Sequence, residues 1–152
     1  MSLNPDLLGR VYPAAAVYDV GREKIREFAA AVKASHPAHY DVAAAQALGY
    51  SDLLAPATFA IIVAQKADSQ LILDPDSGID FSRVVHAEQR FTHHRPIVAG
   101  DALVAELHVD SVRAMGGGAM ISTRAEITTT DGEAVATTRS AILVRGQEED
   151  AE

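Results

Sequence analysis

The hydrophobic pattern of the first third of the chain predicts two helices. Residues 21–34 place apolar side chains at the spacing of one helical face, with charged residues on the opposite face. This apolar stripe consists of Ile25, Phe28, Ala29 and Val32. The residue before a proline disfavours helical dihedrals, so Pro37 predicts that the helix ends by the residue before it. A shorter helix is predicted within residues 41–50 because Gly49 is a suitable C-terminal cap, and a short strand is predicted over residues 16–20.

The most apolar stretch of the chain is residues 55–73, which read APATFAIIVAQKADSQLIL. It is apolar almost all round over residues 59–64. A helix without a polar face is normally buried, so we expect residues 57–73 to form the central helix of the fold. The sequence DPDSG at residues 74–78 ends this helix, since proline, glycine and aspartate together favour a turn.

In the second half of the chain, apolar residues alternate with mostly polar ones, as they do in half-buried strands. The apolar set is clearest at Leu103, Ala105, Leu107 and Val109. The four predicted strands are residues 83–94, 102–112, 119–130 and 134–144. Gly116–Gly118 predicts a hairpin loop between the second and third strands, and Asp131–Gly132 predicts a two-residue hairpin turn between the third and fourth. Strands joined in this way form an antiparallel meander.

This order of elements describes an α+β domain. We expect a single hot-dog fold, in which a curved antiparallel sheet wraps around the long central helix. Residues 1–146 are predicted to form this one domain, and residues 147–152 an acidic, disordered tail. One sheet around one helix leaves an edge and a face uncovered, so the sequence also predicts a dimer.

Composition narrows the range of functions. The chain has 152 residues and a formal net charge of −8, which argues against a nucleic-acid-binding surface. It contains no cysteine, so disulfides, thiolate metal sites and a cysteine nucleophile are excluded. No apolar run reaches the roughly 20 residues that a membrane span needs, and the first residues lack the pattern of a signal peptide. We therefore expect a cytoplasmic protein without a membrane span.

Three histidines, His86, His93 and His94, lie in the predicted strand of residues 83–94, and we first interpret them as structural residues. His93 and His94 are adjacent, and neighbouring strand residues point to opposite faces, so the two side chains cannot easily share one ion. No HExxH motif or thiolate partner accompanies them, and we expect no metal site. His86 is expected to be a half-buried residue that maintains the fold.

Residues 33–41, KASHPAHYD, place two histidines around Pro37 just after the first predicted helix. Histidine suits proton transfer because its pKa lies near neutral pH. From the residues alone, His39 is most simply a helix-end histidine that bonds a backbone carbonyl, and His36 is a structural or pocket-lining residue.

Five segments carry a resemblance to a known family. In chain order they are VGREKIREFA, HPAHY, LLAPATF, RVVHAEQRF and RPIVAGD. Together they resemble the MaoC-like dehydratase superfamily, in particular the actinobacterial single-hot-dog group that includes subunits of the mycobacterial type II fatty-acid-synthase (3R)-hydroxyacyl dehydratase. The resemblance covers about residues 5–145. It implies an acyl thioester on coenzyme A or acyl carrier protein as the ligand, and no dissociable cofactor.

Active members of this superfamily have a motif that resembles G-D-x-N-P-aliphatic-H, with a small residue shortly after it. The sequence matches the motif at Pro37, Ala38, His39 and Ala45. It departs from the motif at Lys33 for the glycine, Ala34 for the catalytic aspartate and His36 for the asparagine. The resemblance implies that His39 is the catalytic histidine and that Ala34 marks the missing aspartate. Asp41 or His36 could take over the missing proton transfer, and spacing does not decide between them.

The resemblance also implies a substrate site at the start of the central helix. The backbone N–H of Ala57 is expected to stabilise the thioester oxygen as negative charge develops on it. The other expected substrate-binding residues are Pro56, Thr58 and His36.

Three functions stay open. The first is an (R)-3-hydroxyacyl-thioester dehydratase or enoyl hydratase of fatty-acid or polyketide metabolism, a lyase that is active as a homodimer. The second is a non-catalytic, acyl-chain-binding subunit of a heterodimer, whose hot-dog partner carries the complete motif; Ala34 favours this function. The third is a hot-dog acyl-thioesterase, which would use a carboxylate such as Asp52 before the central helix.

Overall fold

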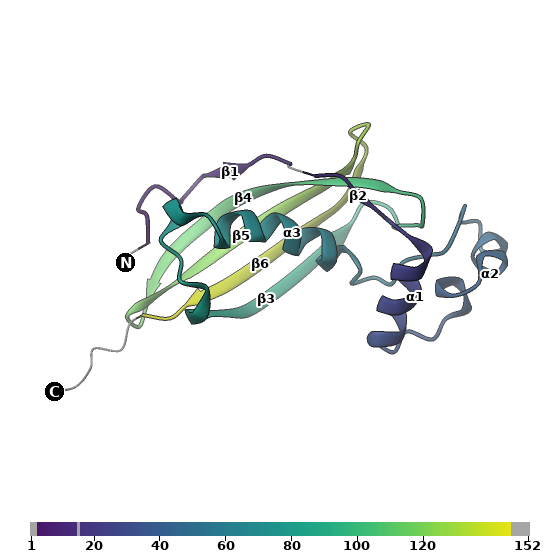
Figure 1. Ribbon diagram of the computed structural model, residues 1–152, viewed down its shortest axis with the longest axis horizontal. Helices are drawn as coiled ribbons and strands as arrows, with labels where there is room; N and C mark the ends of the chain where they lie inside the picture. Colours follow the sequence, from purple (N-terminus) through teal and green to yellow (C-terminus); the bar gives the residue numbers. More distant parts are fainter. Residues whose placement is uncertain (1–2, 15, 147–152) are drawn as a thin grey trace.

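The computed structural model describes residues 3–14 and 16–146, and it places one antiparallel sheet against one long helix (Figure 1). The helices are α1 (Arg22–Ala31), α2 (Val42–Ala47) and α3 (Ala60–Ile72), with 3₁₀ turns η1 (Pro37–His39), η2 (Pro75–Ser77) and η3 (Phe81–Arg83). The strands are β1 (Val11–Tyr12), β2 (Tyr18–Asp19), β3 (Val84–His93), β4 (Ala102–Met115), β5 (Gly118–Thr129) and β6 (Ala134–Val144). The predicted tail, residues 147–152, lies outside the described residues.

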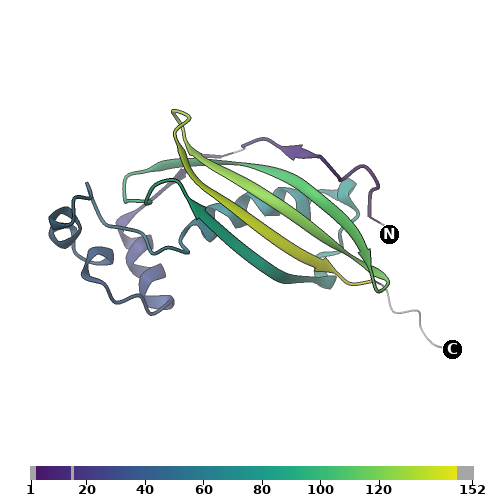
Figure 2. The same ribbon diagram turned by 180° about the vertical axis from the view of Figure 1, so that it is seen from behind.

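Helix α3 lies along one face of the sheet, while α1 and α2 lie together beyond one end of it (Figures 1 and 2). The buried residues of α3 recur at helical spacing and are Ala60, Val63, Ala64, Ala67 and Leu71. On the opposite side of the helix, Gln65, Lys66 and Ser69 are exposed. The central helix is therefore present, but within this chain only one of its sides is buried. It also begins at Ala60 and not at residue 57, where the sequence predicted its start.

The strand order is β1-β4-β5-β6-β3, and β2 also pairs with β4. The four predicted long strands are present, and their pairings are antiparallel. The predicted meander is wrong in one respect, because β3 pairs with β6 and not with β4. Tight hairpins keep β4, β5 and β6 next to one another. The longer connection between β3 and β4, residues 94–101, contains Pro96 and imposes no such pairing.

Glycines with positive φ angles form the turns of both hairpins of the sheet. Gly116 and Gly117 connect β4 to β5 with φ angles of +50° and +83°, which favour glycine. The second hairpin is longer than the predicted two-residue turn, because residues 130–133 separate β5 from β6. A 2.9 Å hydrogen bond from the N–H of Thr129 to the carbonyl of Glu133 closes this loop, and Gly132 has a φ of +89°.

The two edges of the sheet differ. The short strands β1 and β2 lie along β4 at one edge, and β3 forms the other edge. No strand in the described part of the chain pairs with the outer side of β3. A strand edge of this kind presents unpaired backbone groups that can pair with another chain. The uncovered edge that the sequence predicted is therefore β3.

Candidate active site

The candidate site begins where α1 ends. The N–H of Lys33 donates to the carbonyl of Ala30 at 3.2 Å, and the N–H of Ala34 donates to the carbonyl of Ala29 at 2.8 Å. These two bonds form a Schellman motif, in which the residue after the helix takes a left-handed conformation. Lys33 has a φ of +60°, and among the described residues it is the single non-glycine residue with a positive φ. Glycine is the residue that takes this conformation most readily.

Hydrogen bonds then hold the turn that carries both histidines. The side chain of His36 caps η1, because its Nδ1 accepts from the N–H of Ala38 at 3.1 Å. The hydroxyl of Tyr40 donates to the carbonyl of Ala34 at 2.6 Å. The Nε of Arg26 on α1 donates to the carbonyl of Tyr40 at 3.0 Å and ties the turn to the helix. Residues 34–40 therefore have a defined conformation.

His39 is half-buried and faces the loop before α3. Its Nδ1 lies 2.6 Å from the carbonyl oxygen of Leu54, and the N–H of Leu54 donates to the carbonyl of Ala38 at 3.0 Å. A carbonyl oxygen only accepts, so Nδ1 must carry the hydrogen. In the neutral ring, Nε2 is then the basic nitrogen. The carbonyl contact expected for a structural histidine thus also selects the tautomer that a general base needs. The ring of His36 lies 6.1 Å from that of His39 and is exposed.

The loop before α3 contains the three other predicted substrate-binding residues. Pro56 is buried, whereas Ala57 and Thr58 are exposed. The Nε2 of His93 lies 2.7 Å from the carbonyl oxygen of Ala57, and the N–H of Phe59 donates to the carbonyl of Pro56 at 2.9 Å. Within residues 3–14 and 16–146, the N–H of Ala57 donates to no other group. Ala57 therefore lies in a turn that leads into α3, not in the helix itself.

Two carboxylates that are close in sequence to these residues, those of Asp41 and Asp52, have hydrogen-bond partners of their own. The Oδ1 of Asp41 accepts from the N–H of Ala43 at 3.0 Å and caps α2. Asp52 accepts two bonds from Arg22, from Nε at 3.0 Å and from Nη2 at 2.8 Å. The hydrogen bond from Arg22 lowers the pKa of Asp52. Both carboxylates are therefore already hydrogen-bonded, Asp41 at the cap of α2 and Asp52 to Arg22.

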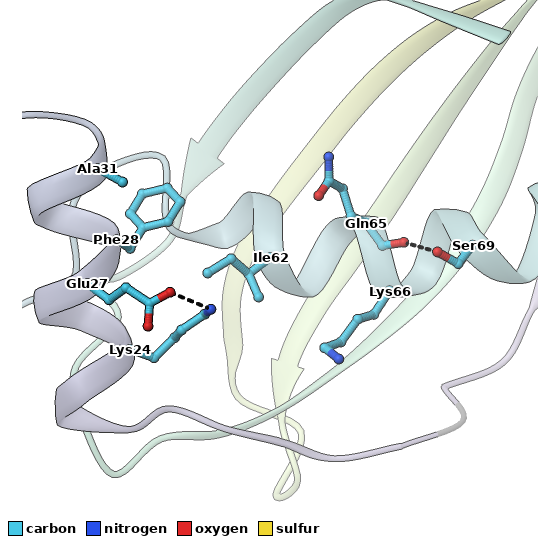
Figure 3. A pocket seen from close by; sticks show the side chains of 8 residues that line it. All are labelled: Lys24, Glu27, Phe28, Ala31, Ile62, Gln65, Lys66 and Ser69. Atoms are coloured by element: carbon cyan, nitrogen blue, oxygen red, sulfur yellow. Dashed lines mark hydrogen bonds and ion pairs between the residues drawn. The ribbon is translucent and has the colours of Figure 1, made fainter.

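A hollow of about 400 Å³ opens between α1 and α3 (Figure 3). Its apolar side chains are Phe28 and Ala31 from α1 and Ile62 from α3. Figure 3 shows Phe28 and Ile62 facing each other across the hollow, with the Lys24–Glu27 ion pair at its rim. The ring of Phe28 meets that of Phe59 edge-on at 5.4 Å. The hollow therefore offers an apolar surface between the end of α1 and the beginning of α3.

No cluster of metal-ligating side chains occurs in the described ranges. His93 bonds Ala57, and the Nε2 of the adjacent His94 lies 3.0 Å from the Oγ1 of Thr137, so the two histidines have separate partners. The described helices include none with the length and apolar character that crossing a membrane requires.

Sequence reasoning missed two features. The contact of His93 with Ala57 joins residues 36 positions apart, and no local pattern predicts it. The second feature is a polar cluster under α3 that includes Asp68 and Gln89. His86 is exposed and not half-buried as the sequence predicted, and its Nε2 lies 3.0 Å from the carbonyl of Glu88 and 3.3 Å from the hydroxyl of Ser140.

Comparison with known proteins gives consistent matches. The family model for the FAS1-like dehydratase domain region matches residues 6–138. A UPF0336 protein from Saccharopolyspora erythraea is 50% identical over 152 residues, which cover 100% of this chain and 97% of that protein. A UPF0336 protein from Clavibacter michiganensis subsp. michiganensis is 51% identical over 148 residues, covering 97% and 99%.

Among solved structures, the C-terminally truncated HadBC (3R-hydroxyacyl-ACP dehydratase) complex from Mycobacterium tuberculosis contains a similar chain. The TM-score is 0.84 at 38% sequence identity, and the match covers 93% of this chain and 99% of that chain. This similarity confirms the predicted α+β hot-dog fold with an antiparallel sheet.

Proposed function

Because the chain belongs to the FAS1-like dehydratase family, the hot-dog dehydratases and hydratases of fatty-acid metabolism, we propose that it is a subunit of an (R)-3-hydroxyacyl-thioester dehydratase or enoyl hydratase. In this proposal it binds the acyl chain, and a hot-dog partner with the complete motif supplies the acid and base. The observation that carries the proposal is Ala34, which stands at the position of the motif's aspartate and has no group that could transfer a proton.

The chemistry of the reaction explains why the residue at position 34 determines whether the chain is active on its own. Dehydration removes a proton from C2, forms the C2–C3 double bond and breaks the C3–O bond, and the hydroxyl leaves as water after it takes up a proton. His39 could exchange one of these protons through Nε2. The N–H of Ala57 could stabilise the thioester oxygen. Since positioned acid and base groups contribute about 10²–10⁴-fold in rate, a chain with Ala34 alone should be nearly inactive.

The ligand in this proposal is an acyl chain on coenzyme A or acyl carrier protein. The outer surface of α3 and the hollow beside Phe28 and Ile62 supply apolar area for such a chain. Pro56, Thr58 and His36 would lie near its thioester end. The chemistry needs no cofactor and no metal.

Two features support a hot-dog partner. The β3 edge is open, and α3 exposes one side along its length. The similar mycobacterial chain belongs to a complex, HadBC. A partner with its own Asp and His pair would cover the open surfaces and complete the chemistry. The rival proposal is a homodimer that is active through His39 alone.

Hydration of crotonyl-CoA by the purified chain, with and without a motif-complete hot-dog subunit, tests the proposal. We expect no detectable hydration by the chain alone and co-purification with the partner in an active complex. Ordinary activity of the chain alone, abolished by His39→Ala, would instead establish the active homodimer.

Restoring the missing carboxylate gives a second test. If Ala34 is the defect, Ala34→Asp should raise the hydration rate of the chain alone by about 10²-fold or more. Ser35→Asp adds the same carboxylate one position later and is the matched control, which should stay inactive. No gain with Ala34→Asp would mean that the site has diverged beyond this residue.

A further inference from the structure

The turn before α3 carries two backbone N–H groups without an acceptor. The N–H of Phe59 donates to the carbonyl of Pro56 at 2.9 Å, and this bond closes residues 56–59 into a β-turn. No backbone carbonyl of the described residues accepts from the N–H of Ala57 or from that of Thr58. Both residues are exposed, so a ligand can reach them.

The backbone conformation of this turn makes the two N–H groups point the same way. Neither Ala57 nor Thr58 has a positive φ, because Lys33 is the single described residue other than glycine that does. A turn with this closing bond and without a positive φ is of type I, whose two central residues have nearly helical dihedrals. Successive N–H groups of a helical turn are parallel and point away from the helix at its beginning. The turn therefore presents two parallel donors.

His93 fixes the orientation of the central peptide unit of this turn. That unit joins the carbonyl of Ala57 to the N–H of Thr58, and its orientation is what distinguishes type I from type II turns. Within the described ranges its carbonyl accepts from no backbone N–H, and the Nε2 of His93 lies 2.7 Å from it. A carbonyl only accepts, so Nε2 carries the hydrogen. Because the carbonyl and the N–H of a trans peptide point in opposite directions, this bond also directs the N–H of Thr58.

The sheet holds the ring of His93 in place. His93 is the last residue of β3, and its ring stacks on that of Phe91 at a centroid distance of 6.2 Å and an interplanar angle of 5°. The turn and the strand are 36 positions apart in the chain, so this contact sets the conformation of the turn from the sheet and not from neighbouring residues.

We propose that His93 is a positioning residue for the thioester. It holds the peptide unit between Ala57 and Thr58 so that the N–H of Thr58 joins the N–H of Ala57 in binding the thioester oxygen. The inference rests on the proposed function, which puts that oxygen at Ala57, and adds to it a second donor and the side chain that orients this donor. Donors stabilise a developing oxyanion best when they are held in place before the reaction.

A labelled thioester tests the two donors without any turnover. The probe is S-butyryl-N-acetylcysteamine with ¹³C at the thioester carbonyl, titrated into the full chain. It contains the thioester end that coenzyme A and acyl carrier protein share, and it has no double bond that could be hydrated. Hydrogen bonds to a carbonyl oxygen move the ¹³C resonance downfield, so we expect a downfield shift on binding to the wild type.

His93→Phe keeps the ring and its stacking on Phe91 but cannot donate. We expect a smaller downfield shift of the bound probe and an affinity that is lower by about two- to tenfold, the value of one hydrogen bond. His93→Gln should restore both, because the amide nitrogen of glutamine can donate from a similar position. His94→Phe is the matched control, since His94 contacts Thr137 instead, and it should bind the probe as the wild type does.

Four results would overturn the proposal: an unchanged bound shift in His93→Phe, no recovery in His93→Gln, an equal effect of His94→Phe, or no binding of the probe. If His93→Phe does not fold, the smaller change His93→Leu takes its place. The proposed function is judged separately by crotonyl-CoA hydration. An active chain without a partner would contradict the subunit role and would leave the bound shift of the probe as it is.

Discussion

Lys33 occupies a left-handed position that glycine fills in the motif of the resembling family. Its φ of +60° brings the side chain close to its own backbone, which costs an L-amino acid roughly 1–2 kcal/mol. Glycine avoids this cost but loses more chain entropy on folding. We therefore expect Lys33→Gly to raise the free energy of unfolding by about 0.5–1 kcal/mol in urea denaturation.

Lys24→Gly is the matched control for this prediction. Lys24 lies within α1, where glycine should lower the free energy of unfolding by about 1 kcal/mol. If both variants are destabilised alike, the left-handed conformation of Lys33 is not a source of strain.

Asp68 should make stability depend on pH in an unusual direction for a carboxylate. Burial raises its pKa above the ordinary value of 3.8, so the protonated form is favoured in the folded state. Its contribution is fully present below the unfolded pKa and is lost as pH rises through the folded pKa. Asp68→Asn keeps an acceptor for Thr123 and cannot ionise.

We therefore expect the stability of the wild type, relative to Asp68→Asn, to fall as pH rises above about 4. Urea denaturation at a series of pH values measures this difference. A constant difference between the two proteins across the series would contradict the prediction.

The sequence predicted single residues well where their neighbours in the chain determine their environment. The turn that holds His36 and His39 follows from Pro37 and the end of α1, which are local features. The contact between His93 and Ala57 and the bond between Thr123 and Asp68 join residues 36 and 55 positions apart. Such contacts depend on the order of strands in the sheet, which no local pattern contains.

At the level of elements, hydrophobic periodicity predicted the three helices and the four long strands. It did not predict the first residue of α3 or the strand with which β3 pairs. Helix α3 begins at Ala60 because residues 56–59 first form a turn. A 2.9 Å hydrogen bond from the N–H of Phe59 to the carbonyl of Pro56 closes this turn. No residue of β3 is buried in this chain, and only Val84, Gln89 and Phe91 are half-buried. Alternation alone therefore could not choose the partner of β3.

The β4–β5 hairpin depends on close approach to the end of β6. A Cβ atom on Gly118 would lie 2.2 Å from the carbonyl oxygen of Val144, so the two backbones must separate to accept a side chain. We expect Gly118→Ala to lower the free energy of unfolding by about 1–3 kcal/mol, as overpacking does. Thermal and urea denaturation measure the loss.

Gly21→Ala is the control for this hairpin variant. A Cβ atom at Gly21 meets no atom within 4 Å, and its φ of −95° suits any residue. Gly21 is the N-cap of α1, where alanine is poorer than glycine, so the loss of stability should be about 0.5–1 kcal/mol. Equal losses in the two variants would mean that the Gly118 contact does not limit the packing of the hairpin.

At the scale of the whole molecule, a single chain leaves parts of its sheet and of its central helix uncovered. The sheet ends in the open β3 edge, α3 is exposed along its outer side, and Ala34 stands where the proposed site would need a carboxylate. In the proposed assembly, a second hot-dog subunit along β3 would cover the edge and α3 and would supply the acid. The contact of His93, on β3, with the carbonyl of Ala57 connects this strand to the loop of the proposed substrate site.

Val85 and Val11 allow this edge to be tested with matched substitutions. Val85 on β3 is 44% exposed and Val11 on β1 is 46% exposed, and they lie at opposite edges of the sheet. A lysine on an edge strand disfavours pairing with another chain. Val85→Lys should therefore weaken association with itself or with a motif-complete subunit by about tenfold or more, while Val11→Lys should not. Sedimentation velocity measures both, and an equal effect of the two variants would place the interface elsewhere.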